Sequence, residues 1–173
     1  TGLGTLPHFY SPRRGRVPAK PVTGCTTHAY LGMKLAGRKT PLLHLSDAAS
    51  WGMVDFSAGG FDAAAMEKAG LDPAFFPGIA KDGVLLGETA DGVPVAPAIG
   101  DNQASFIGTV RNMEESVLIN VGTGSQVSVW MPSPASLPSV EARPCTEGAF
   151  LLVGSSLCGG RAFAALEKFF RVA

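Results

Sequence analysis

The stretch that most constrains the fold is residues 116–130, SVLINVGTGSQVSVW, in which two apolar runs flank a Gly-Thr-Gly-Ser turn. Apolar runs of this length on either side of a short glycine turn predict two antiparallel strands joined as a hairpin. Such a turn is expected to use its glycines for a positive φ angle, which other residues rarely adopt. The sequence therefore predicts β structure at this point of the chain.

The segments around this hairpin alternate between helical and strand-like patterns. Residues 104–110 continue from Asp101 as a helix of small residues, residues 133–144 are predicted as a loop, and residues 148–157 as another strand. Residues 158–172 predict a helix with its large apolar side chains on one face: Phe163, Leu166, Phe169 and Phe170.

The first hundred residues are broken into shorter segments. A helix is predicted over residues 25–36, with Gly37 as its C-cap, and a second within residues 59–71, with Asp62 as its N-cap and Gly70 at its end. The other segments are a loop over 1–24 with a short helix at 6–10, two strand-like runs around a polar break over 41–56, a turn or short helix over 73–79, and short β segments with a turn at Asp91-Gly92 over 83–100. A shift in composition near residue 96 indicates a boundary between two lobes.

Composition and charge exclude several classes of protein. The chain has 173 residues and is 46% hydrophobic and 16% charged, which favours a packed globular core over disorder. Its 14 basic and 14 acidic residues balance, so neither nucleic acid nor an anionic membrane surface is an expected partner. Cys25, Cys145 and Cys158 have no CxxC spacing and suggest neither a disulfide framework nor a zinc site. This use of cysteine makes a reducing cytoplasm the expected location, and no apolar run reaches the length of a membrane span.

An acid and two amides, Asp101, Asn102 and Gln103, follow the apolar approach VPVAPAIG and lead into a run of small residues. The structural interpretation is a turn, because Gly-Asp-Asn is favourable turn chemistry and Asp is a good helix N-cap. This segment alone does not decide between that interpretation and a functional site.

Two glycine-containing turns are candidates for binding phosphate. In the Gly-Thr-Gly-Ser turn, glycines would let phosphate approach backbone N–H groups, and the Thr123 and Ser125 hydroxyls can donate to phosphate oxygens. Gly159 and Gly160 stand between a strand and a helix, where they would either admit a nucleotide to the helix N-terminus or permit close backbone packing. Each turn also has a purely structural interpretation, as a tight hairpin and as a helix entry.

The other polar candidates favour structural roles. In HLSDAASWG, residues 44–52, Ser46 and Asp47 are expected to cap a turn, and Trp51 is expected in the core. No Ser-His-Asp arrangement is apparent, although position in the sequence does not reveal one. No metal-ligand spacing relates the three histidines: His8, His28 and His44.

The order of these motifs resembles a known family. The acid–amide turn, the Gly-Thr-Gly-Ser hairpin and the strand–Gly-Gly–helix follow one another within about sixty residues. The stretches GDNQASFIG, NVGTGSQVS and GSSLCGGRAFAALEKFF resemble the FGGY family of carbohydrate kinases. HLSDAASWGMVDFSAGGFDAAAMEKAGLDPAFFPGI resembles the same family, so the resemblance covers nearly the whole chain. Within the family, TGLGTLPHFY, SDAASWG and GDNQAS are most similar to the sedoheptulokinase branch.

The resemblance implies an α/β fold of the ribonuclease H-like (actin-like ATPase) type, present in part, with pieces of two lobes. Residues 1–95 would form the C-terminal part of the first, sugar-binding lobe, and residues 96–173 the N-terminal part of the second, nucleotide-binding lobe. It also implies transfer of the γ-phosphate of ATP to a sugar hydroxyl, with Mg²⁺ neutralising the phosphate charge. The implied partners are a small-molecule sugar and ATP, and a homo-oligomer is left open.

The resemblance also assigns roles to individual residues. Asp101 matches the general base, which accepts the proton of a sugar hydroxyl that is a poor nucleophile at neutral pH. Asn102, followed by Gln103, matches the amides that bind polyol hydroxyls. The loop that holds the terminal phosphates corresponds to Gly122, Thr123 and Gly124, and the nucleotide-contacting glycine corresponds to Gly160, together with Gly159.

Parts of the family's pattern are missing. The Asp-x-Gly-Thr phosphate loop, the early sugar-contacting residues and the late adenine-binding segment have no counterpart here. The chain also begins without methionine and stops just after a helical pattern, so we expect a piece of a longer enzyme that lacks parts needed for catalysis. The alternatives are a silent sugar- or nucleotide-binding relative acting as a sensor or regulator, another FGGY kinase such as a xylulokinase or glycerol kinase, and an unrelated α/β domain.

Overall fold

The structure is a computed structural model that describes residues 23–172. The predicted loop and short helix before residue 23, and His8 within them, lie outside the described residues. The chain divides between Gly100 and Asp101 into two compact units, and each unit has its own hydrophobic core. We call residues up to Gly100 unit 1 and residues from Asp101 onward unit 2.

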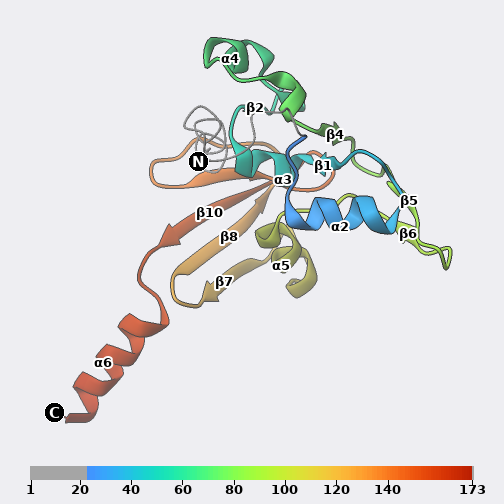
Figure 1. Cartoon of the computed structure of the whole chain (residues 1–173). Coiled ribbons are helices and arrows are strands. Elements are labelled where there is room, and N and C mark those ends of the chain that lie inside the picture. Colours follow the sequence, from blue (N-terminus) through green and yellow to red (C-terminus); the bar gives the residue numbers. More distant parts are fainter. Residues whose placement is uncertain (1–22, 173) are drawn as a thin grey trace, which may run out of the picture. The chain divides into compact units, whose positions relative to one another are not determined.

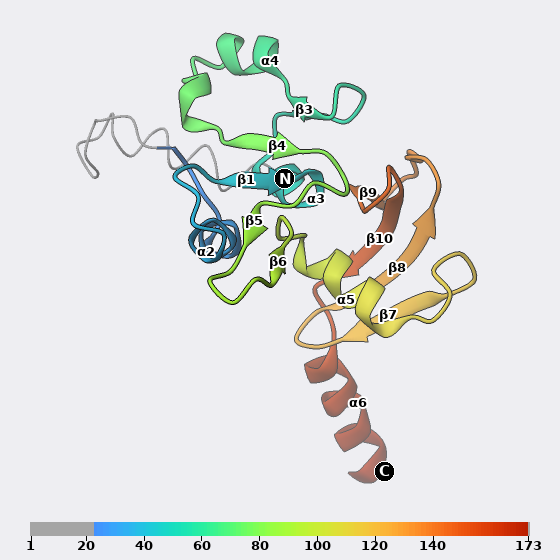
Figure 2. The same cartoon turned by 90° about the vertical axis from the view of Figure 1, so that its right-hand side faces the viewer.

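Unit 1 is built from short elements joined by turns (Figures 1 and 2). A parallel pair, β1 with β4, lies at its centre, and β2 with β3 and β5 with β6 form small antiparallel pairs. In chain order the elements are α2 (Thr27–Leu35), β1 (Leu42–His44), α3 (Leu45–Ala48), the 3-10 turn η1 (Ala49–Trp51), β2 (Val54–Asp55), β3 (Gly60–Phe61), α4 (Ala63–Lys68), η2 (Pro73–Phe75), β4 (Gly78–Ala80), β5 (Gly87–Glu88) and β6 (Pro94–Val95).

The predicted helix boundaries in unit 1 are confirmed by their caps. Gly37 follows α2 with a φ of +63°, and the Arg38 N–H donates to the Met33 carbonyl, which closes the helix end. Asp62 accepts a hydrogen bond from the Ala65 N–H at the start of α4, and Gly70 has a φ of +66° after its end. The polar break predicted inside residues 41–56 forms a helical turn, α3 followed by η1.

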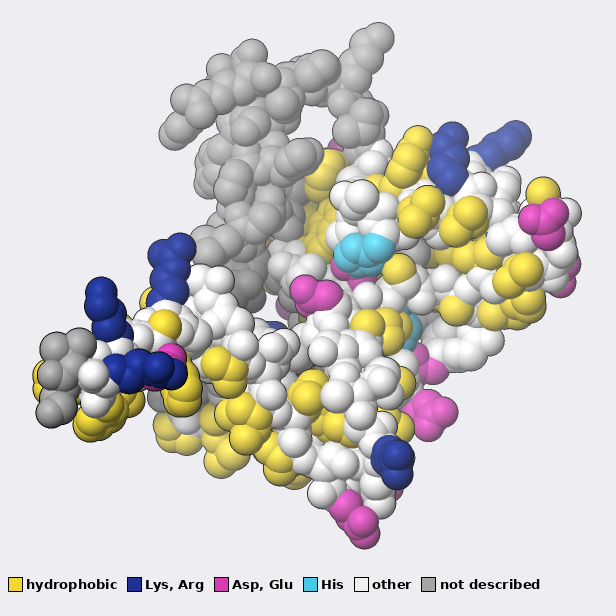
Figure 3. All heavy atoms as spheres, turned by 90° about the horizontal axis from the view of Figure 1, so that it is seen from below, with side chains coloured by type: hydrophobic (Ala, Val, Ile, Leu, Met, Phe, Trp, Pro, Cys, Tyr) yellow, Lys and Arg dark blue, Asp and Glu magenta, His cyan; other side chains and the backbone are white. Residues whose placement is uncertain are grey.

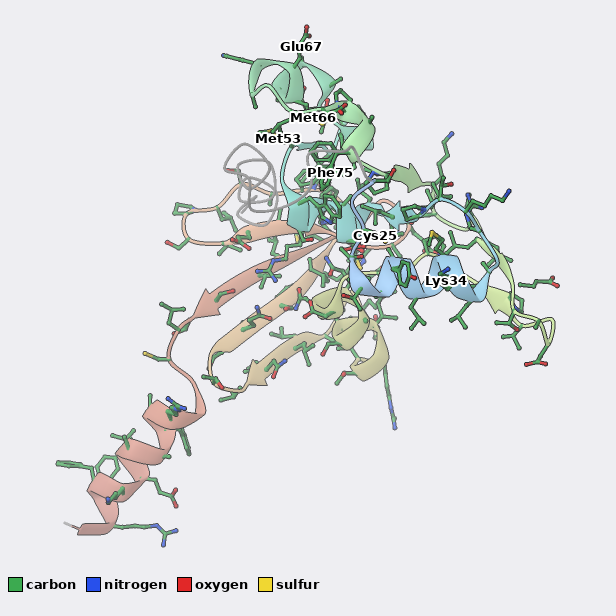
Figure 4. All side chains as sticks on the ribbon, viewed as in Figure 1. Cys25, Lys34, Met53, Met66, Glu67 and Phe75 are labelled. Atoms are coloured by element: carbon green, nitrogen blue, oxygen red, sulfur yellow. The ribbon has the colours of Figure 1, made fainter. Side chains whose placement is uncertain are left out.

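The core of unit 1 lies between α2 and the β1 segment. Ala29, Leu43 and Ala48 are buried there, and Trp51 and Phe61 pack against them. Trp51 is therefore a core residue, as predicted, with Phe75 and Phe76 rings at 6.0 and 6.1 Å from its own. Figures 1 and 2 show α2 and α4 on opposite sides of the β1–β4 pair, and Figure 4 shows Phe75 near Met53 and Met66 on the α4 side.

Unit 2 contains an antiparallel sheet of four strands in the order β7-β8-β10-β9. The predicted strands are β7 (Val117–Val121), β8 (Ser125–Met131) and β10 (Phe150–Ser156). The prediction of a loop over residues 133–144 is wrong at its end, where β9 (Glu141–Pro144) pairs with β10. The pairing is set by the neighbouring strand, because Glu141–Pro144 contains no β-branched or aromatic residue and has little strand propensity of its own.

One face of this sheet is covered by the helix α5 (Asp101–Thr109). Phe106 from α5 is fully buried against Leu151 and Val153 of β10, which forms the centre of the unit 2 core. The opposite face is open: Val117, Ile119 and Val121 of β7 are each more than half exposed. Because side chains alternate along a strand, the residues between them point toward α5.

The helix α6 (Gly160–Val172) follows β10 and extends beyond the end of the sheet (Figure 1). The predicted apolar face exists but is exposed at Phe163, Leu166, Phe169 and Phe170. Figure 3, a view from below, shows hydrophobic side chains in yellow at the surface of the chain. Within the described residues, no helix combines the length and apolar character needed to cross a bilayer.

Candidate active site

The glycines of the β7–β8 turn serve a close approach between backbone segments and do not have positive φ angles. Neither Gly122 nor Gly124 has φ in the left-handed region, so the expectation of positive-φ glycines here is wrong. A Cβ atom on Gly124 would lie 2.9 Å from the Ser156 carbonyl oxygen. The glycines therefore let the end of β10 run directly against the turn.

Gly159 and Gly160 complete this close contact from the other side. The Gly160 N–H donates to the Gly122 carbonyl oxygen at 2.6 Å, and a Cβ atom on Gly159 would collide with the carbonyl oxygens of both Gly122 and Gly124. The packing interpretation of the Gly-Gly pair accounts for these contacts. The Gly160 N–H itself is already used, so a nucleotide here would meet other groups.

A hollow of about 380 Å³ lies beside the turn. Its size falls within the range of small-molecule sites. Its lining contains no charged side chain and combines hydroxyl, carboxamide and backbone groups with apolar surface: Asn120, Gly122, Gly124, Ser125, Gln126, Ser155, Ser156 and Leu157. Such neutral donors suit an anion, because no carboxylate repels it. Thr123 is exposed at the tip of the turn and is not among the lining residues.

Five lining residues were not recognised from the sequence; two are Ser156 and Leu157, and the other three are Asn120, Gln126 and Ser155. Strand pairing brings them together, since Asn120 lies opposite Gln126 on β8, and Gln126 lies opposite Ser155 on β10. The residues that point toward α5 therefore form a polar row across the hairpin end of the sheet. The alternation of side chains along the predicted strands was the available signal for this row. To use it, one also needs the register in which β10 pairs with β8.

Asp101 is the first residue of α5, and its side chain is exposed. Its Oδ1 atom accepts the Asn102 N–H at 2.7 Å, and no basic side chain of the described residues forms an ion pair with it. A carboxylate at a helix N-terminus is favoured by the exposed N–H groups and the helix dipole. It remains able to accept a further hydrogen bond from an approaching group.

Asn102 connects the start of α5 to the row that lines the hollow. Its Nδ2 atom lies 3.4 Å from Gln126 Oε1 and 3.3 Å from Ser128 Oγ on β8. Its Oδ1 atom is buried and has no hydrogen-bond partner among the described residues. A buried acceptor without a donor costs about 1–3 kcal/mol, so this atom marks a place where a donor is missing.

Gln103 is directed into unit 2. Its side chain is only 3% exposed, and its Nε2 atom donates to the Pro144 carbonyl oxygen at 2.6 Å. This bond joins α5 to the end of β9. The geometry favours a role in holding α5 on the sheet, which leaves Asp101 and Asn102 as the polar pair at the start of the helix.

Unit 1 has its own buried polar groups, in the HLSDAASWG segment. Asp47 is buried and accepts from Thr26 Oγ1 at 2.8 Å, and its other oxygen lies 3.0 Å from His28 Nε2. Burial, and after it the Asp47 carboxylate, raises the pKa of the Cys25 thiol, which lies just before α2 (Figure 4). Asp47 therefore makes more contacts than the turn-capping role expected for this segment requires.

Ser46 and His44 of the same segment form a Ser-His-Asp chain with Asp82, an arrangement that was not apparent from the sequence. His44 Nδ1 lies 2.7 Å from Ser46 Oγ, and His44 Nε2 lies 2.6 Å from Asp82 Oδ1. Asp82 is 38 residues away, so only the fold brings it to His44. No group of three acidic, histidine or cysteine side chains suited to a metal ion occurs among the described residues.

Comparisons with known proteins find sedoheptulokinases among the relatives of this chain. No protein-family model matches the chain. The chain is 31% identical over 153 residues to sedoheptulokinase from Homo sapiens and to sedoheptulokinase from Mus musculus, an alignment that covers 80% of this chain and 32% of each relative. The chain thus spans about a third of the length of the curated relatives it matches.

Solved structures show the same fold at lower identity. Xylulose kinase from Rhodospirillum rubrum matches 93% of this chain with a TM-score of 0.76 and 20% identity, over 35% of its own length. Glycerol kinase from Plasmodium falciparum, solved with ADP, matches 76% of this chain with a TM-score of 0.63 and 17% identity, over 29% of its length. The mixed α/β fold therefore matches part of these actin-like kinase structures.

The motifs at Asp101, at the Gly-Thr-Gly-Ser turn and at Gly159-Gly160 lie inside a chain that aligns with sedoheptulokinase and shares the fold of xylulose and glycerol kinases. The chain belongs to the FGGY family of carbohydrate kinases.

Proposed function

We propose that this chain is part of an ATP-dependent carbohydrate kinase that transfers the γ-phosphate of ATP to a sugar hydroxyl. Residues of unit 1 would belong to the sugar-binding lobe and residues of unit 2 to the nucleotide-binding lobe of the ribonuclease H-like fold. The enzyme would work in the cytoplasm. The observation that carries the proposal is the exposed Asp101 carboxylate, one residue away from Asn102, whose amide reaches Gln126 at the hollow.

Asp101 is the proposed general base. The sugar hydroxyl would donate a hydrogen bond to its free carboxylate oxygen and lose its proton as the phosphoryl group arrives. Asn102 would bind a neighbouring hydroxyl, the role that the family resemblance gives this amide, since a carboxamide can both donate and accept hydrogen bonds. Gln103 would act indirectly, because its hydrogen bond to the Pro144 carbonyl holds α5 in place.

The hollow beside the β7–β8 turn is the proposed site for the terminal phosphates of ATP. Its serine hydroxyls, carboxamides and the backbone of Gly122 and Gly124 fit an anion, and Thr123 at the tip would close over it. Gly159 and Gly160 would contribute by keeping the entry of α6 against the turn. Mg²⁺ would arrive with ATP and neutralise the phosphate charge, with phosphate oxygens and water as most of its ligands.

Sedoheptulose is the proposed substrate, with sedoheptulose 7-phosphate as product, because the curated relatives at 31% identity carry that activity in their names. The test is a substrate panel on the complete protein that carries this chain, with MgATP and sedoheptulose, xylulose or glycerol. Strong turnover of sedoheptulose is expected. Turnover of xylulose or glycerol alone would defeat the choice of sugar, and binding of sugar and ATP without turnover of any of the three would favour a silent relative instead.

A further inference from the structure

A continuous chain of hydrogen bonds in unit 1 ends on the residue that precedes Asp101. The Gly100 N–H donates to Ser46 Oγ at 3.0 Å, Ser46 Oγ lies 2.7 Å from His44 Nδ1, and His44 Nε2 lies 2.6 Å from Asp82 Oδ1. Ser46 and His44 are each only 5% exposed, so the middle of this chain is shielded from water. We call these four residues, Asp82, His44, Ser46 and Gly100, the His44 chain.

The direction of each bond in the His44 chain follows from its backbone contacts. The Ser46 N–H also points at His44 Nδ1, at 3.1 Å, and a backbone N–H can only donate. Nδ1 is therefore the acceptor of the imidazole, and the ring proton lies on Nε2, from which it is donated to Asp82. Ser46 accepts from Gly100, so its own proton is directed at Nδ1. Every group in the chain thus has a defined partner.

These same contacts argue against a nucleophilic serine. Ser46 is buried, and its hydroxyl oxygen already accepts a hydrogen bond from Gly100. The imidazole nitrogen that it faces also accepts from the Ser46 N–H, so Nδ1 does not offer the hydroxyl an unshared lone pair. General-base activation of a serine requires such a lone pair and an approach path for a substrate. The His44 chain is built to hold a structure in place.

What the His44 chain holds is the point where the polypeptide leaves unit 1. Gly100 is the last residue of unit 1, and Asp101, the next residue, begins α5. Consecutive Cα atoms are about 3.8 Å apart, so fixing Gly100 restricts the position of Asp101 to a small region. Asp82 and His44 come from the segments around β4 and β1, the parallel pair at the centre of unit 1, so the anchor is tied to its most regular part.

We propose that Ser46 and His44 are positioning residues that act on catalysis through Asp101, by anchoring the Gly100 peptide. The proposal rests on the assignment of Asp101 as the general base. Proton transfer needs the carboxylate within hydrogen-bond reach of the sugar hydroxyl, and a displacement of about 1 Å costs about 10²-fold in rate. Loss of the anchor therefore lowers kcat, whereas the KM for ATP, which depends on the hollow beside the β7–β8 turn, changes little.

The first test compares Ser46→Ala with Ser50→Ala in the complete protein that carries this chain. Ser50 is the control from the same segment, because its hydroxyl donates to the Asp47 carbonyl at 2.7 Å and does not contact Gly100. Ser46→Ala is expected to lower kcat by about 10- to 100-fold with the KM for ATP within about twofold. Equal kcat values for the two variants would overturn the proposal.

Two substitutions of His44 separate the two ends of the chain. Asn places its carbonyl oxygen near the position of Nδ1 and keeps an acceptor for Ser46, whereas Gln places its amide near Nε2 and keeps only the donor to Asp82. His44→Asn is expected to retain most of the kcat, and His44→Gln to lose as much as Ser46→Ala. The reverse order would show that Gly100 is not held through Ser46. This pair also decides the matter if Ser46→Ala fails to fold.

Two further readouts separate this proposal from the assignment of Asp101. Hydrogen exchange of the peptide containing Gly100, followed by mass spectrometry, is expected to be at least about tenfold faster in Ser46→Ala than in Ser50→Ala, since only the first variant frees the Gly100 N–H. Unchanged exchange would overturn the anchor itself, whatever the activity. In an Asp101→Asn background, Ser46→Ala is expected to cost no further kcat, because both act on the same step. Full additivity would overturn the route through Asp101, and normal turnover of Asp101→Asn alone would instead defeat the proposed function.

Discussion

Replacing Gly159 by Ala tests the close packing that builds the candidate phosphate site. The new Cβ atom would lie 2.7 Å from the Gly124 carbonyl oxygen and collide with that of Gly122, and both belong to backbone that cannot rotate away. Ordinary contact begins near 3.4 Å, so the Gly124 contact alone requires the turn and the entry of α6 to separate by about 0.7 Å, and the closer Gly122 contact requires more. The hollow beside the turn would change shape accordingly.

The magnitude follows from three contributions. Overpacking of this kind costs about 1–3 kcal/mol, and weakening of the Gly160 N–H bond to Gly122, 2.6 Å long, costs about 1 kcal/mol more. Replacing glycine by alanine recovers about 0.4–1 kcal/mol, because the unfolded chain loses freedom. Gly159→Ala is therefore expected to lower the free energy of unfolding of unit 2 by about 1–3 kcal/mol.

Gly154→Ala in β10 is the matched control. A Cβ atom there meets nothing within 4 Å, and its φ is not positive, so this variant is expected to keep or slightly raise the stability. Urea unfolding would be followed by tryptophan fluorescence in a Trp51→Phe background, which leaves Trp130, packed against the unit 2 core, as the reporter. Equal unfolding free energies for the two alanine variants would refute the close-approach argument.

Three more predictions follow from the packing and burial of other residues. Phe106→Ala removes the fully buried centre of the unit 2 core and is expected to cost about 3–5 kcal/mol in urea unfolding; a loss below about 1 kcal/mol would contradict its central place. Burial raises the pKa of Cys25, so at pH 8 a thiol reagent is expected to label it more slowly than the exposed Cys158, and stability from the protonated thiol is lost as the pH rises past its ordinary value of 9.0; equal labelling rates would count against this. The open face of β7 is expected to make the 173-residue chain self-associate, and Ile119→Lys to reduce this in sedimentation velocity; a chain that stays monomeric at all concentrations would show that the face is tolerated in water.

The sequence predicted elements whose ends are marked by local chemistry. The helices that end at Gly37 and Gly70, the Asp62 cap and the hairpin around residues 122–125 all depend on a few adjacent residues, and the structure confirms them. The strand β9 was missed because its only cause is the neighbouring strand β10.

The candidate site likewise contains features marked by adjacent residues and features that depend on distant segments. Its motifs at Asp101 and at Gly159-Gly160 were visible as short patterns, whereas Gln126 joins the site only through the register of the sheet. The bond between Ser46 and Gly100 spans 54 residues and leaves no trace in either local pattern. The reason for the turn glycines was also misjudged, because close approach to the end of β10 depends on a strand that arrives later in the chain.

The central claim, that Asp101 is the general base, is tested most directly by the kcat of Asp101→Asn in the complete protein. Asn matches Asp as a helix-capping and turn residue, so the fold, the thermal melt and ATP binding are expected to be unchanged. Loss of the proton acceptor is expected to lower the turnover of sugar by roughly 10²–10⁴-fold. Near-normal turnover in a well-folded variant would contradict the claim and show that the Asp101 carboxylate is structural.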